Sequence, residues 1–207
     1  MKKIALLVEC GRDGLEAIVC KKICNLIEEE KSLEIQINIT PMDNKRNLIE
    51  ACGTVTANLL KDGYERIIIL WDERPAWPTF GETLCLVNER ETILKHLKSE
   101  NISDETVSKN VRLVCIEREF ESWLLFDHKM LERVLSTPEH LKRIQPVRNP
   151  DKQTNPKSAM MSIFKKCGKQ YVDVRWASRI AKCLDTLNCL RKCETFKRFE
   201  DALTDFS

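Results

Sequence analysis

The 207-residue sequence has few glycines and prolines, little aromatic content and no long hydrophobic run. Six Gly and seven Pro residues exclude a collagen-like or low-complexity chain. The longest purely apolar runs, at residues 4–8 and 67–71, are far shorter than the roughly 20 residues of a transmembrane helix. The N-terminal sequence Met1-Lys2-Lys3-Ile4 is not followed by the apolar segment of a secretory signal. We therefore expect a cytoplasmic protein with no membrane partner.

The ten cysteines do not form a recognisable metal or disulfide pattern. No Cys-x-x-Cys pair occurs, and Cys183, Cys189 and Cys193 have spacings that fit no common zinc module. Their share of the chain is below that of small disulfide-stabilised proteins. We interpret them as free thiols in a reducing compartment, acting as small hydrophobic residues.

The net charge of +2 is distributed unevenly along the chain. Residues 142–207 contain 15 Lys and Arg against 7 Asp and Glu, whereas residues 1–141 contain 19 against 25. A basic region joined to an acidic body favours contact with nucleic acid or another acidic partner, although many basic helices are simply solvated. The cations that we expect to contact nucleic acid here are Lys165, Lys166, Arg175 and Arg179.

Hydrophobic periodicity predicts an alternation of strands and helices. The segments with strand patterns are residues 3–9, 33–40, 66–71 and 111–116. The segments between them with helical patterns are residues 15–30, 45–61 and 84–98, and a further helix is expected from Trp123. This order is typical of an α/β fold with a mostly parallel sheet flanked by helices. We expect an α/β domain over residues 1–140, with residues 141–207 as a basic helical region packed on it.

Acidic residues follow three of the four predicted strands. They are Glu9, then Asp72 and Glu73, then Glu117, Glu119 and Glu121. The carboxyl ends of parallel strands meet at one edge of a sheet, which is where such folds bind ligands. Clustered carboxylates repel one another unless a cation lies between them, and hard divalent ions prefer oxygen ligands. The pattern therefore indicates a metal-assisted phosphate chemistry site, although exposed strand ends are also often acidic.

These strand ends resemble the Toprim fold. The matching features are Glu9 after the first strand, Asp72 after the third, and residues 118–125 after the fourth. The last of these, Arg-Glu-Phe-Glu-Ser-Trp-Leu-Leu, is similar to the motif of a Toprim-like family of unknown function. Bacteria often encode that family beside an AAA-type ATPase in anti-phage defence loci. The other matching positions are Asp127, residues 155–157 and residues 195–199.

The resemblance implies a Mg²⁺- or Mn²⁺-dependent nuclease, partnered by an AAA-type ATPase within a larger complex. Glu9 stands where Toprim enzymes have an acid–base residue or metal ligand. Asp72 matches the first acid of their Asp-x-Asp metal motif, but Arg74 occupies the third position. Glu73 or Glu119 is then expected to supply the missing oxygen, or Arg74 to bind phosphate directly. The catalytic residues that the resemblance implies are Glu9, Asp72, Glu119, Glu121 and Lys157.

Two other interpretations stay open at this point. The chain can be a non-catalytic Toprim-like subunit that docks on an AAA-type ATPase or a nucleic acid, or a small-nucleotide-binding domain that uses the same strand ends. We interpret Trp123 as a core residue beneath the acidic cluster. Residues 75–80 and the phenylalanines near the C-terminus are candidates for partner contact or for the core; the phenylalanines are Phe196, Phe199 and Phe206.

Overall fold

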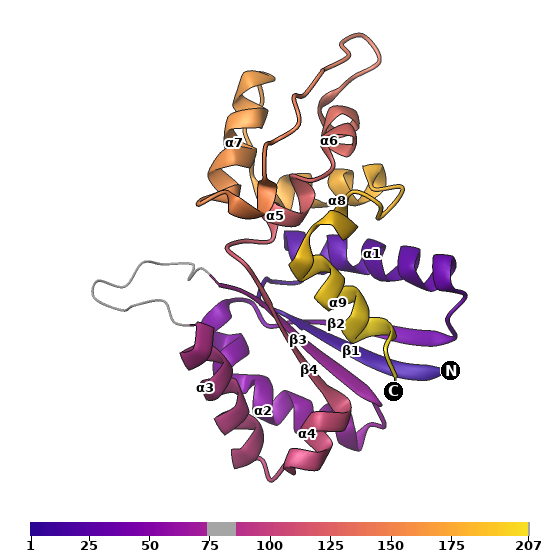
Figure 1. Cartoon of the computed structure of the whole chain (residues 1–207), viewed down its shortest axis with the longest axis vertical. Helices are drawn as coiled ribbons and strands as arrows, with labels where there is room; N and C mark the ends of the chain where they lie inside the picture. The colour runs from indigo at the N-terminus through magenta and orange to yellow at the C-terminus, as the bar shows by residue number, and fades with distance from the viewer. Residues whose placement is uncertain (74–85, 207) are drawn as a thin grey trace.

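A four-stranded parallel sheet forms the centre of the protein (Figure 1). The computed structural model describes residues 1–73 and 86–206. The strands are β1 (Lys2–Val8), β2 (Ile35–Pro41), β3 (Arg66–Asp72) and β4 (Val111–Ile116), and their order in the sheet is β2-β1-β3-β4. The predicted α/β class with a parallel sheet is confirmed.

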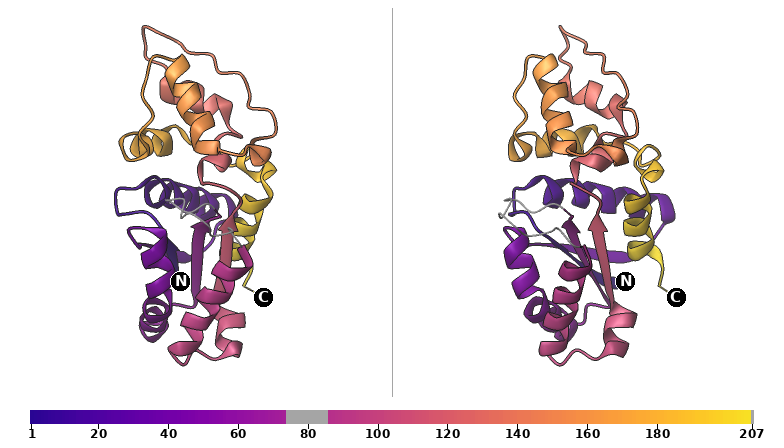
Figure 2. Two further views of the ribbon diagram at one scale, coloured as in Figure 1. Left: turned by 90° about the vertical axis from the view of Figure 1, so that its left-hand side faces the viewer. Right: turned by 60° about the vertical axis from the view of Figure 1, so that its left-hand side comes forward.

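Helices cover both faces of the sheet (Figures 1 and 2). On one face lie α2 (Lys45–Lys61), α3 (Leu86–Ser99) and α4 (Asp104–Asn110), and on the other lie α1 (Leu15–Lys31) and α9 (Glu194–Thr204). Alternate residues of β1 point to opposite faces, as in any strand. Ile4 and Leu6 pack in the core that contains α1, whereas Ala5 and Leu7 pack in the core that contains α2. Both faces are buried, which explains why β1 and β3 are nearly continuous apolar runs.

The remaining helices lie above α1 in the view of Figure 1. They are α5 (Glu121–Leu124), α6 (His128–Leu135), α7 (Pro156–Lys166) and α8 (Asp173–Cys183), with short 3₁₀ turns at Pro150–Lys152 and Leu190–Lys192. Helix α8 packs on α1 and α9 packs on β4, so the C-terminal region shares its core with the sheet. The helix predicted from Trp123 is two helices, because the Asp127 carboxylate accepts a hydrogen bond from the Met130 amide (2.8 Å) and starts α6 there.

Trp123 anchors the contact between the sheet and the C-terminal region. Its side chain is fully buried, and its indole N–H donates a hydrogen bond to the Thr195 hydroxyl (2.8 Å). Its ring centroid lies 5.2 Å from those of Phe120 and Phe196 and 5.4 Å from that of Phe199. The core role predicted for Trp123 is confirmed. Phe196 and Phe199 also complete the core and present no surface to a partner.

The nine cysteines within residues 1–73 and 86–206 are all free thiols, as expected. No helix in these two ranges is both long and apolar enough to cross a membrane.

Candidate metal centre

Asp72, the last residue of β3, lies at the centre of an acidic cluster. Its side chain is only 8% exposed, although a carboxylate at a strand end is usually solvated. One carboxylate oxygen, Oδ2, accepts a hydrogen bond from the backbone amide of Phe120 (3.2 Å). The other, Oδ1, is buried and has no hydrogen-bond partner. A buried oxygen of this kind is costly unless something else, such as a cation, compensates it.

Glu9 reaches the same place from the neighbouring strand. β1 and β3 run parallel with Val8 opposite Leu70, so the residues that follow them emerge at one edge of the sheet. The Glu9 carboxylate accepts a hydrogen bond from the Asp72 amide, at 3.4 Å. The predicted convergence of Glu9 and Asp72 is therefore present.

The third carboxylate belongs to Glu16, in the first turn of α1. A tight turn connects β1 to this helix: the Gly14 amide donates to the Gly11 carbonyl (2.8 Å), and the Cys10 sulfur accepts from the Ala17 amide (3.3 Å). A Cβ atom at Gly14 would lie 2.5 Å from that of Cys10, so this close approach requires glycine. The turn brings one oxygen each of Glu9, Glu16 and Asp72 to within 4.8 Å of one another.

The proton affinities of these groups show the electrostatic cost of the cluster. Burial, together with the negative charge of Glu16, raises the pKa of Glu9 to about 8. Burial and the charge of Glu9 likewise raise the pKa of Asp72 well above its usual range. Both shifts show that burial and the mutual repulsion of the acids disfavour the ionised carboxylates.

The buried cation Lys45 interacts mainly with groups outside the cluster. Its ammonium donates to the backbone carbonyls of Asp72 (2.6 Å) and Glu73 (3.1 Å), and it forms an ion pair with Glu89 (2.7 Å). Glu89 also accepts from the indole of Trp71 (3.0 Å). Lys45 thus holds the end of β3 in place, and its charge lowers the pKa of Glu9 only in part. The three carboxylates and the unpartnered Asp72 oxygen fit a bound metal ion.

A cavity of about 430 Å³ opens beside the cluster. Its walls come from the β1–α1 turn with Glu9 and Glu16, from the start of α2 and from the start of α8. The cavity is large enough for a small ligand or for a segment of a larger one.

Two of the predicted metal ligands lie outside this group. Glu119 accepts a hydrogen bond from the backbone amide of Lys157 (2.9 Å), at the first turn of α7. Glu73 accepts from the Arg118 amide (3.1 Å), and the Arg118 guanidinium lies 3.6 Å from it. Within residues 1–73 and 86–206, the acids whose oxygens lie close to one another are Glu9, Asp72 and Glu16. Glu16 thus takes the place that was predicted for Glu73 or Glu119. Sequence reasoning missed Glu16 because it followed strand ends alone, yet the first turn of a helix after a parallel strand lies at the same edge of the sheet.

Glu121, a predicted catalytic residue, is buried behind the cluster. Its carboxylate accepts a hydrogen bond from the Tyr171 hydroxyl (3.1 Å). Burial raises the pKa of Glu121 to about 7, although the positive charge of Lys157 opposes this. The charge of Glu121 in turn contributes to the raised pKa of Asp72. Glu121 therefore influences the cluster electrostatically without belonging to it.

Lys157, the other predicted catalytic residue, pairs with Asp173 on the cavity wall. The distance between the Lys157 ammonium and the Asp173 carboxylate is 2.7 Å, and the Lys157 side chain is 45% exposed. Burial alone would lower the pKa of Lys157, but the hydrogen bond to Asp173 and the charge of Glu121 keep it above its usual range. Lys157 is thus a partly exposed, ion-paired cation at the rim of the cavity.

The cations predicted to contact nucleic acid are exposed on two helices. Lys165 and Lys166 lie near the end of α7, and Arg175 and Arg179 lie on α8. Arg179 also donates to the Ser136 carbonyl (2.7 Å).

The surface predicted for partner contact is only partly within the described structure. Arg74 and residues 75–80 lie outside the described residues. Phe206 is half-buried, with the ammonium of Lys2 3.8 Å from its ring centroid and the guanidinium of Arg66 4.6 Å from it.

The fold and the site together define an α/β protein with a carboxylate cluster at the carboxyl edge of a parallel sheet. The chain belongs to the family described as "Domain of unknown function (DUF4276)", whose model matches residues 16–204. This range includes Glu16 and Asp72 and begins after Glu9. No curated protein and no solved structure matches the chain.

Proposed function

We propose that the protein is a Mg²⁺- or Mn²⁺-dependent nuclease that hydrolyses phosphodiesters of nucleic acid. The observation that carries the proposal is the approach of Glu9, Glu16 and Asp72 to within 4.8 Å around a buried, unpartnered oxygen. The resemblance of the strand ends to Toprim nucleases gives this cluster its proposed chemistry.

The ligand chemistry favours a hard divalent ion. All three groups are carboxylates, which suit Mg²⁺ and Mn²⁺ better than softer metals. Such an ion supplies Lewis-acid stabilisation of the negative charge that develops on a phosphate during its hydrolysis. Asp72 is held for this role by the Phe120 amide, and Lys45 fixes the strand end that carries it.

The groups around the cavity have complementary roles in the proposal. Glu9, Glu16 and Asp72 hold the ion, and the cavity admits the substrate next to them. Lys157 lies near the cavity through its pair with Asp173, where a positive charge attracts the phosphate backbone. The exposed cations of α7 and α8 extend the attraction along the surface.

The proposal includes control by an AAA-type ATPase subunit in a cytoplasmic anti-phage defence complex. The resemblance stated above supports this partner, and the free thiols are compatible with a reducing compartment. An unregulated nuclease would damage its own cell, so control by a partner is physically sensible. The alternative, a non-catalytic subunit that docks on the ATPase, shares the fold and the partner but not the metal-dependent cleavage.

A cleavage assay tests the nuclease proposal. We expect the purified chain, alone or with the ATPase, to cut a mixture of DNA and RNA with Mg²⁺ or Mn²⁺ and not with EDTA. Glu9→Gln should reduce the rate by about 100-fold or more, because it removes a metal-supporting charge while keeping the side-chain volume. The matched control is Glu117→Gln, which changes an exposed acid that pairs with Arg198. Equal activity of Glu9→Gln and wild type would contradict the proposal, and an inactive chain that binds the ATPase would favour the docking alternative.

A further inference from the structure

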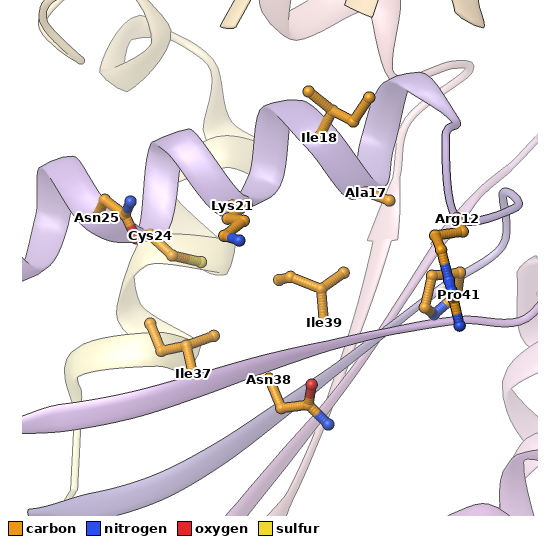
Figure 3. A pocket seen from close by; sticks show the side chains of 10 residues that line it. All are labelled: Arg12, Ala17, Ile18, Lys21, Cys24, Asn25, Ile37, Asn38, Ile39 and Pro41. Atoms are coloured by element: carbon orange, nitrogen blue, oxygen red, sulfur yellow. The ribbon is translucent and has the colours of Figure 1, made fainter. Parts of the chain in front are cut away.

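A second cavity lies between α1 and β2, at the open edge of the sheet (Figure 3). Its volume is about 450 Å³. In Figure 3, Ile37 and Ile39 point from β2 toward α1, and Lys21 lies on the side of α1 that faces β2. Arg12 lies beside Pro41 at one end of this groove. Because β2 is an edge strand, no further strand of residues 1–73 and 86–206 covers the groove on that side.

The lining of the groove is apolar and basic. Among the described residues that line it are two cations, Arg12 and Lys21, and no carboxylate. Both side chains are exposed, and neither forms an ion pair within the part of the chain that the structure describes. Asn25 adds an amide, which both donates and accepts hydrogen bonds, at the end of the groove opposite Arg12. This lining suits a ligand that has an anionic part and a flat, partly apolar part.

The groove lies next to the cavity beside the metal centre. Arg12 lines both cavities. On α1, Glu16 lines the cavity beside the metal centre, and the next residue, Ala17, lines the groove. A chain-like ligand with a phosphate at the carboxylate cluster can therefore extend past Arg12 into the groove.

We propose that this groove is a subsite for one nucleotide of a single strand, next to the phosphate that is cleaved. This inference rests on the proposed nuclease function. Arg12 and Lys21 pair with the phosphates, and the base lies on the apolar floor of Ile37 and Ile39 with its edge near Asn25. Apolar side chains and amides recognise unstacked bases in this way, whereas a base pair within a duplex cannot enter. The volume falls within the range of about 300–1,000 Å³ that is usual for small-ligand sites.

Binding in the absence of metal tests the subsite separately from catalysis. The full chain is titrated in EDTA with a fluorescent single-stranded hexanucleotide and, separately, with a nucleoside monophosphate. Arg12→Gln and Lys21→Gln should each lower the log–log salt slope of oligonucleotide binding by about 0.7. A slope that is smaller by about 0.7 corresponds to binding about fivefold weaker than that of the wild type at about 0.1 M salt. Lys22→Gln, which removes the same charge from the neighbouring position of α1 outside the groove lining, should change binding much less.

The outcomes separate the subsite from the nuclease function. Unchanged binding in Arg12→Gln and Lys21→Gln, or no binding by wild type, would overturn the subsite even in a protein that cleaves nucleic acid. If both variants bind the oligonucleotide more weakly but the wild type cleaves no nucleic acid, the groove is supported as a nucleotide site. The same result rejects the proposed nuclease function. A monophosphate that binds as tightly as the hexanucleotide, with the same response to the variants, would show that the ligand is a free nucleotide and overturn the assignment to a strand.

Discussion

Two carboxylate clusters lie at opposite ends of α1 and differ in their electrostatics. In the last turns of α1, Glu30 meets Arg191, whose guanidinium also binds both oxygens of Glu200 at 3.0 and 2.9 Å. Burial alone would raise the pKa of Glu200, but the bonds to Arg191 keep it below its usual range. In the first turn of α1, Glu16 meets two other carboxylates, and the pKa of Glu9 is raised to about 8. The first cluster is neutralised by cations of the protein itself, whereas the second is a group of carboxylates that could hold a metal ion.

The comparison shows how to distinguish a structural cluster from a functional one. A paired set of charges stabilises the fold when its geometry is good, and breaking it is costly. An unpaired set of buried carboxylates destabilises the fold, and proteins retain such groups mainly at functional sites.

The largest effect should come from Arg191→Met, which leaves the buried Glu200 carboxylate without its main partner. Breaking a buried pair typically costs about 3–5 kcal/mol, and we expect about 2–3 kcal/mol here because the Arg191 side chain is 28% exposed. For a chain of this size, the melting temperature should fall by about 5–10 °C in calorimetry. Adding Glu200→Gln should restore part of the loss. An unchanged melting temperature would show that the paired cluster is not structural.

A smaller loss is expected when the turn that positions Glu16 is overpacked. Gly14→Ala places a Cβ atom 2.5 Å from that of Cys10, so the turn must shift. We expect a destabilisation of about 1–3 kcal/mol, together with weaker metal binding. The matched control is Gly11→Ala, whose new Cβ atom would meet only Asp43, at 3.7 Å. Urea unfolding of the two variants tests this prediction, and equal stability would contradict the account of the turn.

The smallest effect concerns the dependence of stability on pH. The pKa of Glu9 is about 8 in the folded state against about 4.5 for the free side chain, so the folded protein binds its proton more tightly. The stability that this bound proton gives to the folded state is fully present below about pH 4.5 and is lost as the pH rises through about 8. The melting temperature of the metal-free protein should therefore fall by a few degrees between about pH 7 and about pH 8.5.

Glu9→Gln is the control for this pH dependence, since glutamine does not ionise. Melting curves in EDTA should be flatter with pH in the variant than in the wild type, and saturating Mg²⁺ should flatten the wild-type profile as well. A wild-type protein that becomes more stable toward pH 8.5 in EDTA would contradict the raised pKa of Glu9.

The local sequence predicts most of the sheet because burial on both faces leaves a clear pattern. The predicted boundaries of residues 45–61 and 111–116 agree with α2 and β4, where apolar periodicity is complete. Helix α4 was not predicted because its sequence, Asp104–Asn110, is polar and has no buried residue. It follows the capping hydroxyl of Ser103, which accepts from the Thr106 amide (3.1 Å).

The candidate site was predicted only in part, for a reason that concerns distance along the chain. Glu9 and Asp72 follow neighbouring parallel strands, so their meeting is implied by the sheet itself. The position of the Glu119 side chain depends on Lys157, 38 residues further along, whose amide it binds. Only the packing of α7 fixes that contact, and no local pattern contains it. Glu16 could have been predicted as a member of the site, since it lies in the first turn of the helix that follows β1.

The most direct test of the account is a titration of the purified chain with Mn²⁺, followed by electron paramagnetic resonance at pH 8. In the wild type we expect one saturable Mn²⁺ site that Mg²⁺ displaces. This site should be lost in Asp72→Asn, weakened in Glu16→Gln and retained in Glu73→Gln. Asp72→Asn should also be at least as stable as the wild type in EDTA, because it removes a buried carboxylate whose Oδ1 oxygen has no hydrogen-bond partner. Absence of saturable binding in the wild type, or a site that survives Asp72→Asn and is lost in Glu73→Gln, would contradict the assignment of the metal centre.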